Sequence, residues 1–185
     1  TYFYPDLPKN FQISQHGTEL GQGGELLVDY LSYDKKRSEG FRVKFDQIHL
    51  EEDTGKLIHE RDATLIDFNR AGVPLLEIVS KPVIPSPEKA WLFVRELQRV
   101  ARVLSVSTAN MEEGELRVDA NISLSIRKDS KTAKWEHGAK VEIKNLNSFV
   151  SLKKALQYEI ERQKELLKRG RKIIQETRGW EQKEG

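Results

Sequence analysis

The segment Glu115-Leu116-Arg117-Val118-Asp119-Ala120-Asn121-Ile122-Ser123-Leu124-Ser125-Ile126 alternates apolar and polar residues along its whole length. Because successive side chains of a β-strand point to opposite faces, this pattern predicts a strand with one apolar and one polar face. Residues 139–145 repeat the pattern, with Val141 and Ile143 on one face. The polar segment 127–138 separates the two, so an antiparallel hairpin is the simplest connection. If the strands pair, their polar face brings together Arg117, Asp119, Glu142 and Lys144.

Further strands and two helices are expected around this hairpin. The strands are predicted at about 25–33, 41–50, 63–69 and 73–79. One helix begins after Ser86, a good N-cap residue, and a second covers residues 149–169, with Gly170 as its stop. Helical spacing predicts the buried stripes, Ala90, Phe93, Val94, Leu97, Val100, Ala101 and Leu104 in the first helix and Leu152, Leu156, Ile160 and Leu167 in the second. Strands in groups followed by helices predict an α+β fold, an antiparallel sheet with packed helices.

Composition limits the function classes only loosely. The 185 residues suit one domain with a real core, and 31 basic against 29 acidic residues do not by themselves indicate nucleic-acid binding. The basic run at 168–172 could contact phosphates, but a solvated helix end is the favoured interpretation. The absence of cysteine excludes a disulfide framework, a thiolate zinc site and a cysteine nucleophile within these residues. No segment approaches the roughly 18 apolar residues of a membrane span, so we expect no membrane partner.

Carboxylates provide the strongest chemical signal. Glu77 lies in a strand pattern that is apolar on both faces, so its carboxylate is expected to be buried beside an arginine or a metal ion. An acidic turn spans residues 49–56. Together with Asp119 and Glu142 these residues could supply the oxygen ligands that Mg²⁺ prefers. Arg117, Lys144 and Arg70 could then neutralise phosphoryl groups. The alternative for the two paired strands is an ordinary solvated sheet face.

Other chemistries are less well supported. The pair Gly55-Lys56 is followed by Leu57, so no Walker-type phosphate loop is present. The four histidines have no spacing typical of a catalytic triad or a zinc site, and there is no nucleophile-elbow motif.

Several segments, in order along nearly the whole chain, closely resemble the B subunit of aspartyl/glutamyl-tRNA amidotransferases. They are residues 2–9, 12–15, 48–56, 67–77, 110–114, 117–121, 144–148 and 175–178, and include Ile48-His49-Leu50-Glu51-Glu52-Asp53-Thr54-Gly55-Lys56 and Gln175-Glu176-Thr177-Arg178. The resemblance implies a cradle-shaped catalytic domain related in fold to glutamine synthetase. Residues 1–185 would form part of that domain, with an N-terminal strand segment and C-terminal helical and tail domains expected outside it.

The resemblance also implies a reaction and its partners. Mg²⁺ and ATP phosphorylate the side-chain carboxylate of Glu-tRNA(Gln) or Asp-tRNA(Asn), and ammonia released from glutamine by the A subunit, a glutaminase, then displaces the phosphate. A heterotrimer with the A and C subunits is expected, in the bacterial cytoplasm or in a mitochondrion or plastid, and the fragment alone is expected to be inactive. A non-catalytic tRNA-binding or assembly module and a carboxylate-metal nuclease are the alternatives.

Residue by residue, the resemblance implies two sets of site residues. The metal and catalytic carboxylates fall on Glu52, Glu77, Asp119 and Glu142. The phosphate- and nucleotide-binding residues fall on Arg70, Arg117, Lys144, Lys9 and Ser14. In residues 80–86, Lys81 and Val83 replace the acids usual in the family, which affects the contacts of that turn but not the core carboxylates.

Overall fold

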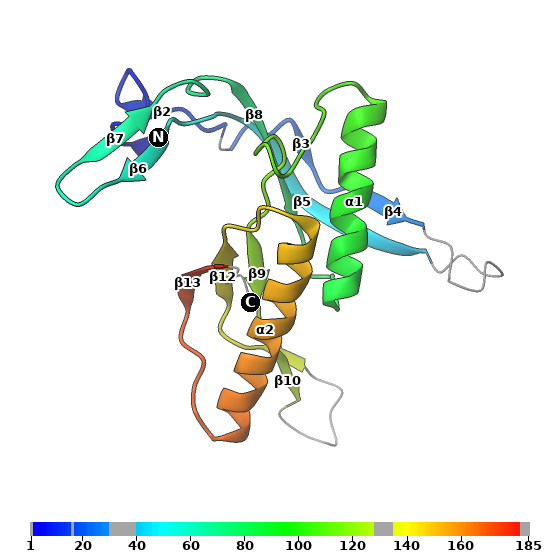
Figure 1. The fold of residues 1–185 in the computed structure, drawn as a ribbon. Coiled ribbons are helices and arrows are strands. Elements are labelled where there is room, and N and C mark those ends of the chain that lie inside the picture. The colour runs from blue at the N-terminus through cyan, green and yellow to red at the C-terminus, as the bar shows by residue number, and fades with distance from the viewer. Residues whose placement is uncertain (1, 16, 30–39, 128–134, 182–185) are drawn as a thin grey trace. The chain divides into compact units, whose positions relative to one another are not determined.

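The computed structural model describes residues 2–15, 17–29, 40–127 and 135–181 (Figure 1). The chain divides into two compact units, Thr1–Ile84 and Pro85–Gly185, and each is described by itself. The combination of mainly antiparallel sheets and two helices confirms the predicted α+β class. In the described part of the chain, neither helix is long and apolar enough to cross a membrane.

The first unit is built around one long strand, β5 (Phe41–Glu52). It pairs antiparallel with β3 (Gly21–Gln22), β4 (Glu25–Val28) and β8 (Pro74–Ser80). The register between β5 and β8 shifts between Phe45 and Gln47 and then continues without interruption to Glu52. Val28 and Val43 are buried in this sheet, at 2% and 0% exposure. The sheet therefore holds the second half of β5 and the whole of β8 in a defined register.

Two hairpins complete this unit, β1 (Tyr2–Phe3) with β2 (Phe11–Gln12) and β6 (Lys56–His59) with β7 (Thr64–Asp67). Gly55 fastens them to each other, because its N–H donates to the carbonyl oxygen of Asp6 at 2.6 Å. A Cβ atom on Gly55 would lie 2.7 Å from the carbonyl oxygen of Asp6 and 2.9 Å from that of Asp67. Only glycine allows the backbones to approach this closely.

The second unit contains both helices, α1 (Pro87–Val103) and α2 (Phe149–Lys168). Each begins as predicted, because the Ser86 hydroxyl accepts from Lys89 N–H at 3.2 Å and the Ser148 hydroxyl accepts from Ser151 N–H at 3.0 Å. Gly170 follows the end of α2 with a φ of 67°, the left-handed conformation that stops a helix. The two predicted helices are thus confirmed to within a residue or two at their ends.

A three-stranded sheet lies against α2. Its central strand, β12 (Val141–Lys144), is antiparallel to β9 (Ala120–Ile122) and parallel to β13 (Glu176–Gly179). The core between helix and sheet is apolar at its centre and is formed by Ile122, Val141, Ile143, Leu152, Ala155 and Leu156, all below 9% exposure. A further pair, β10 (Ser125–Arg127) with β11 (Trp135–His137), continues from β9.

The single long strand predicted over 115–126 is wrong. Residues 115–119 form no ladder, and β9 and β10 are separate short strands. Glu115 is held elsewhere, because its Oε2 accepts from the Thr108 hydroxyl and from Asn110 N–H at 3.0 Å. The alternation of faces nevertheless holds, with Leu116, Val118, Ala120 and Ile122 less exposed than their polar neighbours.

Other boundaries differ more modestly. The strand predicted at 25–33 ends at Val28, and residues 30–33 lie outside the described part of the chain. The segments 41–50, 63–69, 73–79 and 139–145 match the observed strands β5, β7, β8 and β12. The sequence patterns predicted none of the strands β1, β2, β3, β6, β11 and β13.

Candidate metal and phosphate site

In the first unit, a histidine and two carboxylates converge on one face of the β5–β8 ladder. His49 and Glu77 are directly paired across the strands, and Glu51 lies two residues along β5 on the same face. His49 Nε2 lies 3.2 Å from Glu51 Oε1 and 3.0 Å from Glu77 Oε2. The side chains become more exposed along this series, from 8% for His49 through 17% for Glu51 to 49% for Glu77. The cluster is therefore buried at His49 and open to solvent at Glu77.

The side chains of this cluster are of the types that bind a divalent cation. One ligand atom from each of the three residues lies within 4.8 Å of the others. Two carboxylates this close repel each other unless a positive charge lies between them, and either a proton on His49 or a metal ion can supply it. His49 Nδ1 is buried without a hydrogen-bond partner among the described residues, so the described contacts of the ring are all at Nε2. Two carboxylate oxygens and one imidazole nitrogen fit a divalent cation that keeps other positions for water or phosphate.

Glu77 is not buried, contrary to the expectation from its apolar surroundings in sequence. Strand β8 pairs with β5, and its other apolar residues are also accessible, with Leu76 44% and Ile78 37% exposed. Leu75 and Val79, which share the face of Glu77, are half-buried, but the Glu77 side chain is 49% exposed, so its carboxylate is in contact with water. The side chain paired with Glu77 is His49 and not an arginine, and the metal ion expected from the sequence stays a prediction.

The structure brings Glu51, rather than Glu52, next to Glu77. Glu52 lies one residue further along β5 and therefore on the opposite face, where its Oε2 is 2.6 Å from the ammonium of Lys9. Hydrogen bonding to Lys9 is the largest influence that lowers the pKa of Glu52 from its ordinary value of 4.5, and the Ile13 N–H adds to it. Lys9 and Glu52, both predicted site residues, thus form a pair separate from the His49 cluster. The assignment of Glu52 to a metal stays a prediction.

The two remaining predicted residues of this unit occupy structural positions near the same strand. Arg70 Nε donates to the Thr54 carbonyl at 2.9 Å and lies 3.8 Å from Asp53 Oδ1. Ser14 is half-buried, and the residue after it runs beside β5, since Gln15 N–H donates to the Leu50 carbonyl at 3.0 Å. Neither residue is brought to the His49 cluster by a described hydrogen bond or ion pair.

In the second unit, the predicted polar face does form. Lys144 Nζ lies 2.8 Å from Asp119 Oδ2 and 3.7 Å from Glu142 Oε1. The hydrogen bond to Asp119 is the main cause that raises the pKa of Lys144 above 10.5, so the ammonium is charged at neutral pH. Arg117 is exposed two residues before Asp119, on the same side of the alternating segment. Lys144 therefore lies between two carboxylates on a solvent-facing surface.

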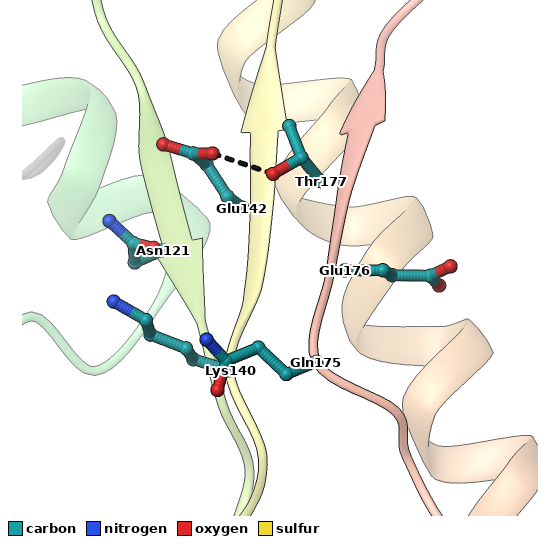
Figure 2. A pocket seen from close by; sticks show the side chains of 6 residues that line it. All are labelled: Asn121, Lys140, Glu142, Gln175, Glu176 and Thr177. Atoms are coloured by element: carbon teal, nitrogen blue, oxygen red, sulfur yellow. Dashed lines mark hydrogen bonds between the residues drawn. The ribbon is translucent and has the colours of Figure 1, made fainter.

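One row of side chains crosses this sheet. The register pairs Glu142 with Asn121 on β9 and with Thr177 on β13. The Thr177 hydroxyl donates to Glu142 Oε2 at 2.8 Å, and Figure 2 shows the two side chains pointing toward each other. A hollow of about 290 Å³ opens here, lined by Asn121, Lys140, Glu142, Gln175, Glu176 and Thr177. Its lining combines amide and ammonium donors with the carboxylates of Glu142 and Glu176.

Sequence reasoning included Glu51 only as part of the acidic turn at 49–56, and it did not identify His49 or Thr177 as site residues. Period two puts His49 and Glu51 on one face once the strand predicted over 41–50 is extended by one residue, but their position beside Glu77 depends on the pairing of β5 with β8. Residues 175–178 were noticed only for their resemblance to known proteins. Nothing in their hydrophobic pattern indicates a strand.

The fold is of the α+β class, and its sheets expose side chains of the kinds that bind divalent cations and phosphate groups. Comparison with known proteins identifies the family within this class. The chain belongs to the GatB/GatE catalytic domain family, whose model matches residues 1–185.

Curated relatives in three bacteria are named as the B subunit of aspartyl/glutamyl-tRNA(Asn/Gln) amidotransferase. The protein of Clostridium tetani is 47% identical over 181 residues, which cover 98% of this chain and 36% of the relative. The protein of one Thermus thermophilus strain is 47% identical over 184 residues, or 100% and 36% of the two chains. That of Nostoc sp. is 47% identical over 190 residues, or 98% and 37%. The chain thus spans little more than a third of the length of these relatives.

Proposed function

We propose that this chain is the ATP-dependent catalytic part of the B subunit of a tRNA amidotransferase. It would activate the side-chain carboxylate of Glu-tRNA(Gln) or Asp-tRNA(Asn) for conversion to the amide. Family membership over residues 1–185 and the names of the relatives support the enzyme class. The cluster of His49, Glu51 and Glu77 is the observation that supports the chemistry.

The proposed reaction has two steps. A carboxylate oxygen of the aminoacyl group attacks the γ-phosphorus of ATP, which forms an acyl phosphate and releases ADP. Ammonia then attacks the acyl carbon, phosphate leaves with the electron pair of the broken C–O bond, and an amide remains after loss of a proton. Negative charge accumulates on the phosphoryl oxygens in the first step, so cationic groups there lower the barrier.

Each group of residues has a role in this scheme. His49, Glu51 and Glu77 would hold Mg²⁺, which when bound neutralises phosphate oxygens. Lys144 would supply a fixed positive charge, and Asp119 would keep its ammonium in place through the 2.8 Å contact. Arg117, exposed two residues before Asp119, would add a second cation. The assignment of Glu52, Glu77, Asp119 and Glu142 to the metal, made from the sequence, stays a prediction and is the alternative ligand set.

The partners follow from the same proposal. The A subunit would supply ammonia from glutamine, the C subunit would complete the heterotrimer, and the misacylated tRNA would be the substrate. We propose a bacterial cytoplasmic enzyme.

The test is the Mg²⁺ dependence of phosphoryl transfer from ATP to Glu-tRNA(Gln) by the assembled complex with the full-length B subunit. Glu51→Gln and Glu77→Gln should raise the Mg²⁺ concentration for half-maximal rate by about tenfold or more, because each removes a charged ligand without changing its shape. Glu25→Gln is the matched control, since Glu25 also lies on a strand of this sheet and pairs with a cation, Arg42. Glutaminase activity, followed in parallel, should be unchanged in all variants.

Other outcomes distinguish the alternatives. A Mg²⁺ requirement shifted by Glu52→Gln but not by Glu51→Gln would contradict the cluster described above and support the assignment made from sequence. Unchanged transfer in all these variants would favour a non-catalytic tRNA-binding or assembly module. Cleavage of tRNA on a gel in the absence of ATP would favour a nuclease.

A further inference from the structure

The edge strand β13 is fastened to α2 by a network of ion pairs. Glu159 on α2 is 1% exposed and accepts two hydrogen bonds of 2.8 Å from Arg162. It also accepts from Gln163 Nε2 at 2.8 Å and lies 3.7 Å from Arg178 Nε on β13. A carboxylate this deeply buried is tolerated because cations and donors surround it.

Glu176 on β13 closes the network. Its Oε1 accepts from Arg162 Nη2 and from Arg178 Nη1, both at 3.1 Å. Two glutamates and two arginines therefore alternate between the helix and the strand. Formal charge is balanced within the network, and every member has a partner on the other element or within it.

This network determines which side chain of β13 meets Glu142. Glu176 and Arg178 occupy the helix-facing side of the strand, so Thr177 between them points to the opposite face. Figure 2 shows Glu176 directed away from Glu142, while Thr177 points toward it. Because side chains alternate, a shift of one residue in register would place a charged side chain of β13 against Glu142 in place of the hydroxyl.

We propose that Thr177 is a positioning residue for Glu142, and that the network of Glu159, Arg162, Glu176 and Arg178 holds it in register. The Thr177 hydroxyl donates to Glu142 Oε2, while Oε1 is directed toward Lys144. The two oxygens of Glu142 therefore have different partners, and the carboxylate keeps one orientation on an otherwise exposed face. Fixed orientation of a reacting or ligand-binding group is what catalytic sites require. This inference rests on the proposed function.

The experiment compares variants of the full-length B subunit in the assembled complex. Thr177→Val removes the donor and keeps the volume, and Thr177→Ser keeps the donor. We expect Thr177→Val to lower kcat for phosphoryl transfer about tenfold, the effect of one hydrogen bond to a charged group. Thr177→Ser should keep most of the activity, and Tm should change by less than about 2 °C in both. Thr64→Val is the control, because the Thr64 hydroxyl lies 3.0 Å from His59 Nδ1 on a hairpin outside the site.

A double-mutant cycle and a structural measurement complete the test. Thr177→Val combined with Glu142→Gln should be no slower than Glu142→Gln alone, since the hydroxyl acts through that carboxylate. Arg178→Lys keeps the charge but not the fork of donors, so hydrogen exchange of the β13 amides should accelerate and kcat should fall. Faster exchange without a change in kcat would refute the role of the network.

The remaining outcomes separate this inference from the proposed function. If Glu142→Gln lowers kcat and Thr177→Val does not, the positioning role is wrong and the proposed function stands. Equal losses for Val and Ser, or additive losses in the double mutant, would also refute it. If Glu142→Gln itself leaves transfer unchanged, the catalytic role of this face fails, and the positioning role fails with it.

Discussion

Replacing Glu159 by Gln should destabilise the second unit by about 2 to 3 kcal/mol, and the structure shows why. Glutamine has the same shape as glutamate, so the substitution leaves no cavity; it removes the negative charge and replaces one acceptor oxygen by an NH2 donor. Arg162 and Arg178 then face each other with Glu176 as their common acceptor. A charge-balanced network with a buried centre then carries an excess positive charge.

The magnitude follows from the contacts. Glutamine keeps one acceptor oxygen, but its amide NH2 cannot accept, so one of the two bonds from Arg162 is lost at a cost of about 1.5 to 3 kcal/mol. Breaking a fully buried ion pair costs about 3 to 5 kcal/mol. The two arginines keep some contact with water, at 23% and 38% exposure. The expected cost is therefore closer to the loss of one hydrogen bond than to the loss of a fully buried ion pair.

Trp180 provides a local probe for this measurement. It follows β13 directly, and its ring lies 6.2 Å from that of Tyr158 on α2. Urea unfolding of the full-length protein, followed by Trp180 fluorescence with its other tryptophans replaced by Phe, Trp91 and Trp135 among them, reports the docking of β13 on α2. Glu161→Gln, at an exposed helix position paired with Lys164, is the control and should change the unfolding free energy by no more than about 0.5 kcal/mol. Coincident unfolding curves for the Glu159 and Glu161 variants would refute the reasoning.

Three further predictions concern other parts of the chain. Gly55→Ala should cost about 2 to 3 kcal/mol in urea unfolding, because the new methyl group meets two backbone carbonyls, whereas Gly21→Ala, with open space around it, should not. The raised pKa of Lys144 means that its pairing stabilises the fold fully below pH 10.5 and less as the pH rises through the raised value. In alkaline unfolding, the Asp119→Asn variant should therefore not show this pH-dependent loss of stability. Ser86→Ala should destabilise α1 by about 1 kcal/mol in thermal unfolding, through loss of the cap.

The sequence predicted the elements whose local signals agree with their packing. The two helices carry serine caps and apolar stripes, and both begin where those signals place them. The apolar alternation of 139–145 identified β12, and Val141 and Ile143 are almost completely buried. The alternation predicted a common face for Asp119, Glu142 and Lys144, and the three side chains are in contact there.

Elements that depend on long-range contacts were predicted poorly. The segment 115–119 has a strand pattern but finds no pairing partner, and Glu115 is bound to residues of the preceding loop instead. Propensity and alternation describe which face a residue takes, whereas ladder formation depends on what lies beside it. The same limit explains the choice of Glu52, because the length of β5 beyond residue 50 is set by its pairing with β8.

Strand β13 illustrates why some strands are invisible to hydrophobic pattern. Glu176, Thr177 and Arg178 offer no apolar residue, since the side that faces α2 is occupied by ion pairs and the other side by the hydroxyl at Glu142. Replacing such a network with apolar residues often leaves a protein as stable or makes it more stable, so stability alone is a weak reason for its presence. Ion pairs with fixed geometry differ from apolar contacts in that they distinguish one register from the next. A four-residue parallel edge strand has little else to define its register, and a slip of one residue would remove Thr177 from Glu142. The charged residues that make β13 unrecognisable from its hydrophobic pattern are therefore the residues that position the Thr177 hydroxyl.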